Sequence, residues 1–119
     1  MMDNGLIQLD DFDLDQFGWG IVYVHLSVSG PSAKCWRLLN EAHSTSEKLM
    51  QIPIVQVNGL AIKNEGDIFT TYMDSSYHGV GETFWVNEGQ FINWTRFSLR
   101  YSQVVIEHSE QLLQLRAAM

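Results

Sequence analysis

The chain has 119 residues, of which 45% are hydrophobic, 12% aromatic and 18% charged, and seven bases against 14 acids give a net charge of −7. This length and composition fit one compact domain and exclude global disorder. The negative charge argues against direct binding to nucleic acid or to anionic lipid, and it favours a basic partner.

The N-terminal segment is polar and acidic. We expect residues 1–17 to form an acidic, flexible arm and residues 18–119 to form a single domain. The first residues lack the basic start and apolar run of a secretory signal, and the single cysteine, Cys35, cannot form an internal disulfide. These features predict a cytoplasmic protein without a membrane span.

Aspartates alternate with apolar side chains in residues 9–17 (LDDFDLDQF). The Asp-Asp-Phe-Asp-Leu-Asp run resembles the acidic-aromatic core of transcriptional activation domains. As an extended strand, the segment would instead project Asp11, Asp13 and Asp15 on one side at intervals of about 6.6 Å, as a row of carboxylates that imitates a phosphate backbone. A third interpretation is a solvated acidic arm or edge strand whose charges prevent aggregation.

The next two segments predict a strand and a helix. Residues 19–29 alternate between two faces, with Val22 and Val24 on a fully apolar side, so we expect a strand. Helical spacing follows from Pro31 to residue 50, with Cys35 and Met50 among the residues expected on the inner side. A capping-box pattern at residues 44–47 (STSE) predicts that this helix breaks and restarts near Ser44.

The middle of the chain predicts short strands joined by turns. Asn58-Gly59 separates residues 54–57 from residues 60–62 and favours a type I′ hairpin between them. Further strands are expected at residues 68–73 and 83–86, with a loop at residues 74–82 between them. Asn-Glu-Gly occurs twice, at residues 64–66 and 87–89, and predicts two turns of the same type.

The C-terminal third fits two alternatives. Apolar spacing favours one long helix from about residue 93, but residues 97–101 also alternate as a strand that would precede a helix from about residue 103. Both alternatives make residues 104–115 helical. On the long helix, one flank would carry an apolar row able to pair across a two-fold axis in a homodimer, formed by Ile92, Leu99, Ile106 and Leu113.

The predicted fold class is therefore α+β: a small antiparallel sheet of four or five strands, including the hairpin at Asn58-Gly59, packed against a helix in the N-terminal half and a long C-terminal helix. No histidine has metal-ligand spacing, and no glycine loop precedes a helix as in phosphate sites. Ser76 and His78 lie close together in a predicted loop, but closeness in sequence does not supply the geometry of a catalytic triad. We therefore expect no catalytic residue, no cofactor, no metal and no enzyme activity.

The acids gather in two stretches without a base, residues 1–33 and 64–95. This pattern predicts a small acidic protein-binding protein that inhibits or regulates a basic, nucleic-acid-handling partner. In size and charge the chain is similar to anti-restriction, anti-CRISPR and DNA-mimic proteins and to toxin-immunity proteins. The expected partner-binding residues are Asp10, Asp11, Asp13, Asp15, Glu65, Asp67, Asp74 and Glu82.

The sequence also fits two other classes of function. The first is a small ligand-binding domain or enzyme with a cleft between the sheet and the helices, for which the loop at residues 75–81 would serve as a lid. The residues expected to line this cleft are Trp19, Tyr72, Tyr77, His78 and Trp85. The second is a structural subunit of a homo-oligomer.

Overall fold

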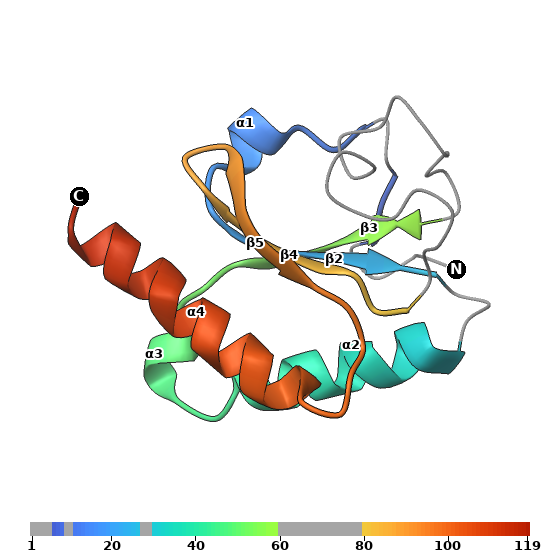
Figure 1. Cartoon of the computed structure of the whole chain (residues 1–119). Helices are drawn as coiled ribbons and strands as arrows, with labels where there is room; N and C mark the ends of the chain where they lie inside the picture. The colour runs from blue at the N-terminus through green and yellow to red at the C-terminus, as the bar shows by residue number, and fades with distance from the viewer. Residues whose placement is uncertain (1–5, 9–10, 27–29, 60–79) are drawn as a thin grey trace.

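A computed structural model describes residues 6–8, 11–26, 30–59 and 80–119. In this part of the chain the fold is α+β, as predicted, with a mixed sheet between two layers of helix (Figure 1). Its elements in chain order are β1 (Leu6–Ile7), α1 (Leu14–Phe17), β2 (Gly20–His25), α2 (Gly30–His43), α3 (Glu47–Met50), β3 (Ile54–Asn58), β4 (Thr83–Asn87), β5 (Gln90–Thr95) and α4 (Tyr101–Ala117).

The strands lie in the order β1-β3-β2-β4-β5. β3 runs parallel to both β1 and β2, whereas β4 is antiparallel to both β2 and β5. The sheet is therefore mixed and not purely antiparallel as expected. The reason is the crossover through α2 and α3, because a helical connection returns the chain to the same end of the sheet and leaves β2 and β3 parallel.

β3 confirms the strand expected over residues 54–57, but it differs in its partners. Gln56 pairs with Leu6 of β1 on one side and with Tyr23 of β2 on the other. Both edges of β3 are thus occupied at this point. The second strand of the expected hairpin, residues 60–62, and the strand expected at residues 68–73 lie outside the described residues.

β2 is the central strand, and both of its faces are buried. Ile21 and Tyr23 pack into a cluster with side chains of α2, α3 and α4, which cover one face of the sheet (the helical face). Val22 and Val24 pack into a second cluster on the opposite face, which α1 covers (the α1 face). Figure 1 shows α1 on one side of the sheet and α2, α3 and α4 on the other. The alternation predicted from the sequence is confirmed.

The predicted break in the first helical segment is also confirmed. α2 ends at His43, and α3 begins after Ser46, whose Oγ accepts the Leu49 N–H at 3.1 Å. Such an N-cap contributes about 1 kcal/mol to stability. Cys35 lies on the buried side of α2 as expected, whereas Met50 is 55% exposed and does not line the core.

The long helix favoured from residue 93 is wrong. Residues 90–95 form β5, and α4 begins only at Tyr101, so the expectation that residues 104–115 are helical is confirmed. The physical reason is tertiary: Phe91 and Trp94 pack on Phe84 of the neighbouring strand, with ring centroids 4.8 and 5.9 Å from it. Strand pairing on the α1 face therefore outweighs the helical spacing of these residues.

The expected self-association row does not form one helical flank. Ile92 lies in β5, and Leu99 is fully exposed in the turn before α4. Ile106 and Leu113 lie on α4 but pack against the core of the helical face. The geometric basis for a paired row is lost, and self-association stays a prediction. Among the described helices, none is long and apolar enough to span a bilayer.

Candidate partner-binding site

The described part of the acidic segment is integrated into the domain. β1 pairs with β3, and Phe12, Leu14 and Phe17 pack against the valine-rich cluster of the α1 face. Burying apolar side chains of this size is worth about 1.5–3 kcal/mol each when complete. The aromatic and aliphatic residues that alternate with the aspartates therefore hold the segment on the sheet, and these described residues do not form a free arm.

The segment is also not an extended strand. Asp13 is the N-cap of α1, and its Oδ1 accepts the Gln16 N–H at 3.1 Å. The helical turn then closes through the Phe17 N–H, which donates to the Asp13 carbonyl at 2.9 Å. Asp15 lies inside this turn, so the expected row of three carboxylates along one strand edge is wrong. The capping preference of aspartate explains the difference, because a single helical turn satisfies backbone donors that a solvated strand leaves to water.

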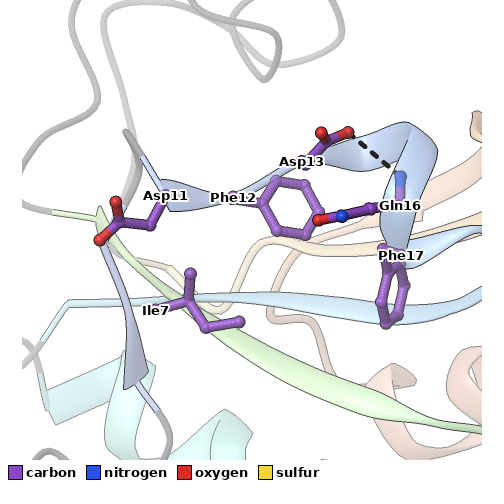
Figure 2. A pocket seen from close by; sticks show the side chains of 6 residues that line it. All are labelled: Ile7, Asp11, Phe12, Asp13, Gln16 and Phe17. Atoms are coloured by element: carbon purple, nitrogen blue, oxygen red, sulfur yellow. Dashed lines mark hydrogen bonds between the residues drawn. The ribbon is translucent and has the colours of Figure 1, made fainter.

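A pocket of about 260 Å³ lies between β1 and the α1 segment. Figure 2 shows Asp11 and Ile7 at one end, Phe17 at the other and the Phe12 ring between them. One lining residue comes from β1 and five come from the segment, in a set consisting of Ile7, Asp11, Phe12, Asp13, Gln16 and Phe17. The pocket therefore combines an apolar lining with two carboxylates.

The two rings of this pocket have fixed positions. The Phe12 and Phe17 centroids lie 6.0 Å apart with their planes at 52°, a usual arrangement for an aromatic pair. Phe17 also contacts the start of β2, where Gly20 has a φ of +137°. A Cβ at Gly20 would lie 2.7 Å from the Phe17 ring and 2.5 Å from the Pro53 carbonyl oxygen. Only glycine fits this position, so Gly20 allows Phe17 to approach the sheet.

In the described part of the chain the bases are unevenly placed between the two faces, whereas acids lie on both. Asp11, Asp13 and Asp15 lie on the α1 face and are exposed. Five described bases lie on or next to the helices of the helical face, namely Lys34, Arg37, Lys48, Arg100 and Arg116. Arg96 follows β5 and lies over the Trp94 ring, 5.2 Å from its centroid. Among the residues that the structure describes, no base lines the pocket.

The remaining expected partner-binding residues do not join this site. Glu82 is completely buried, and its Oε1 accepts the Val80 N–H at 3.2 Å, so its placement on a binding surface was wrong. The expectation failed because charge predicts exposure, and Glu82 is an exception whose carboxylate accepts a backbone N–H. The others, Asp10, Glu65, Asp67 and Asp74, lie outside the described residues.

Sequence reasoning missed a buried polar cluster at the N-terminal end of α2. The Tyr23 hydroxyl donates to the Ser32 carbonyl, and the Ser32 Oγ accepts the Leu26 N–H at 2.9 Å. Beside it, the Thr83 and Tyr101 hydroxyls lie 2.8 Å apart. No local pattern reveals this cluster, because its members come from β2, α2, β4 and α4 and meet only in the fold.

Cys35 lies in the same buried region. Burial, and next the negative charge of Glu82, raise the pKa of its thiol to about 12. A thiol is nucleophilic as the thiolate, so Cys35 is an inert, protonated side chain at neutral pH. Among the described residues, no group of three His, Cys, Asp or Glu side chains is arranged to hold a metal ion.

Trp85 does not line the open cleft that the alternative interpretation expected. Trp85 is completely buried, and its indole N–H donates to the Ser109 Oγ at 3.1 Å. Trp19 packs on the helical face under the Arg116 guanidinium, 4.6 Å from the ring centroid. The remaining three residues of that expectation, Tyr72, Tyr77 and His78, lie outside the described residues.

No family model matches the sequence, and no curated protein sequence matches it either. Among solved structures, the chain is similar to the crystal structure of thioredoxin f2 from Chlamydomonas reinhardtii. That match has a TM-score of 0.53 and 16% sequence identity, and it covers 90% of this chain and 97% of the thioredoxin chain. The fold is thus thioredoxin-like.

Proposed function

We propose that this chain is a protein-binding protein of thioredoxin-like fold that recognises a basic partner through the α1 face. The observation that carries the proposal is the placement of charge around the sheet. Three exposed aspartates lie on the α1 face, and two of them line a pocket to which no described base contributes, while most described bases lie on the helical face beside glutamates. A surface of one sign attracts and orients a partner of the opposite sign.

Thiol chemistry of the thioredoxin kind does not fit this chain. Such chemistry uses a Cys-x-x-Cys pair and an accessible thiolate. This chain has one cysteine, and Cys35 is buried with a raised pKa. We therefore extend the proposal to a role without thiol–disulfide exchange, in which the fold serves as a scaffold for binding. A lone thiol is compatible with the cytoplasm, where thiols are kept reduced.

The proposed partner class is a nucleic-acid-handling protein. Such proteins hold phosphates with clustered Lys and Arg, and a net charge of −7 with exposed aspartates competes for the same cations. Binding there would inhibit or regulate the partner, in the manner of anti-restriction, anti-CRISPR and DNA-mimic proteins or of toxin-immunity proteins. This role needs no catalytic group on the chain itself.

The test compares two triple variants with the same change of charge. Asp11, Asp13 and Asp15 are replaced by Asn in the first variant, and three exposed glutamates of the helical face, Glu41, Glu47 and Glu110, are replaced by Gln in the second. Immobilised protein captures partners from lysate across a salt series, with identification by mass spectrometry. We expect the wild type and the Gln variant to retain basic proteins at low salt, and the Asn variant to lose them.

The captured protein is then assayed for nucleic-acid binding or cleavage with and without this chain. Inhibition by the wild type and not by the Asn variant supports the proposal. Equal capture by both triple variants would refute the role of the α1 face.

A further inference from the structure

We infer that the pocket between β1 and α1 holds an arginine side chain of the basic partner, an inference that rests on the proposed function. The pocket volume of about 260 Å³ lies just below the range of about 300–1,000 Å³ that is usual for small-molecule sites. It therefore suits a single inserted side chain better than a cofactor.

The apolar lining fits the stem of a long cationic side chain. Ile7, Phe12 and Phe17 are half-buried and form most of the wall. Arginine buries its methylene groups along such a wall while its charged end stays near polar groups and water. A shorter polar side chain would leave this apolar surface uncovered.

The rim fits the charged end. Asp11 and Asp13 are exposed at the rim of the pocket. The salt bridges among the described residues join Arg37 and Arg100 to glutamates of the helical face and do not involve these two aspartates. Asp13 uses Oδ1 to cap α1, but a carboxylate has about four acceptor positions. Asp13 can therefore cap α1 and accept a hydrogen bond from a guanidinium at the same time.

The aromatic rings favour arginine over lysine. A planar guanidinium stacks on aromatic faces and pairs with carboxylates through several N–H groups, whereas an ammonium is a compact, strongly hydrated charge. Among the described residues, Arg116 lies over Trp19 at 4.6 Å and Arg96 over Trp94 at 5.2 Å, and Lys34 lies over Phe97 at 5.3 Å, so the preference for arginine depends on its guanidinium pairing with the carboxylates while it stacks on a ring. An arginine between Phe12 and the aspartates would repeat this arrangement.

A second hollow of about 360 Å³ lies between β5 and α4 and provides a contrast. The described residues that line it carry amides and aliphatic groups and no charge, in a set consisting of Ile92, Asn93, Gln111, Gln114 and Leu115. Nothing there distinguishes a cation from a neutral side chain of the same shape. Charge complementarity therefore assigns the arginine to the pocket on the α1 face.

The test uses a blocked tripeptide, Ala-Arg-Ala, and the same peptide with citrulline, the neutral isostere of arginine. Binding is followed by NMR through the Gln16 backbone amide and the Phe12 and Phe17 ring protons. We expect saturable shifts of these signals with the arginine peptide and at least fivefold weaker binding of the citrulline peptide. Substituting Asp11→Asn or Asp13→Asn should weaken arginine binding about fivefold each, near the upper limit for an exposed ion pair.

The variants separate charge from structure. Asparagine caps helices about as well as aspartate, so Asp13→Asn removes the charge and keeps the α1 cap. Glu47→Gln changes the charge equally in the first turn of α3 on the helical face, and it should change binding less than twofold. Phe12→Leu keeps an apolar wall and removes a ring, and it should weaken binding of the arginine peptide.

Three results would overturn the inference: equal binding of the arginine and citrulline peptides, equal effects of Asp13→Asn and Glu47→Gln, or shifts confined to Gln111 in the second hollow. The proposed function fails separately. If partner capture depends on the aspartates of the α1 face but the arginine peptide does not bind the pocket, the partner uses that face without inserting an arginine.

Discussion

Raising the pH should destabilise the folded protein through the thiol of Cys35. Burial is the largest cause that raises its pKa from 9.0 to about 12, and the charge of Glu82 adds to it. Between these two values the unfolded chain loses the thiol proton and the folded chain keeps it, so the folded state binds more protons and the free energy of unfolding falls as pH rises. Between about pH 8 and pH 10 this linkage removes about 1 kcal/mol.

The measurement is urea unfolding of the wild type and of Cys35→Ala at several pH values in this range. The alanine variant should be less stable at every pH because it leaves a small cavity, and that cost does not depend on pH. Its stability should fall less steeply, by about 1 kcal/mol over the range. Burial also raises the pKa values of Tyr23 and Tyr101 in both proteins, and Cys35 is a smaller cause for each, so most of the tyrosine contribution is common to the two pH profiles. Parallel pH profiles would refute the reasoning.

Three further substitutions test the packing of the domain. Gly81→Ala places a Cβ 2.4 Å from the Cys35 sulfur at a φ of +73°, and urea unfolding should show a loss of about 2–4 kcal/mol, so a neutral result would contradict this contact. Ser46→Ala removes the α3 cap and should cost about 1 kcal/mol in the same assay, whereas Ser46→Asp should retain most of the stability. Tyr101→Phe deprives the Thr83 hydroxyl of a buried partner and should cost about 1 kcal/mol, which is contradicted if the melting temperature is unchanged.

The elements with strong local signals were predictable from the sequence. β2 follows from alternating β-branched and aromatic residues, and the break between α2 and α3 follows from the capping residues at positions 44–47, although the N-cap of α3 is Ser46 and not Ser44. In both places the local preference agrees with the tertiary contacts. β4 was expected because residues 83–86 are β-branched or aromatic.

The strand β5 was not predictable from spacing alone. Ile92 and Leu99 are seven residues apart, as on a helix, but the chain turns between them and only Ile92 faces a core. Pairing with β4 decides the structure of residues 90–95, and a single sequence does not show that pairing. The parallel pairing of β3 with β1 was missed for the same reason, because it joins residues 50 positions apart, such as Leu6 and Gln56.

The candidate site was predictable in part. The alternating acidic and aromatic residues of the segment identified Asp11 and Asp13 as partner-binding candidates. Their arrangement around a pocket was not foreseeable, since Ile7 reaches the pocket only through the register of β1 with β3. Glu82 was assigned to the surface from its charge, and only the fold shows that it is buried.

The two-residue strand β1 gives the pocket an unfolding equilibrium of its own. So short an edge strand is held by few hydrogen bonds, and such elements open at a much lower free energy than central strands. We expect such an opening to withdraw Ile7 from the pocket while β2 and β4 stay folded. A partner that needs the closed pocket must therefore stabilise β1, and amide exchange at Ile7 would slow on binding while exchange at Val22 stays unchanged.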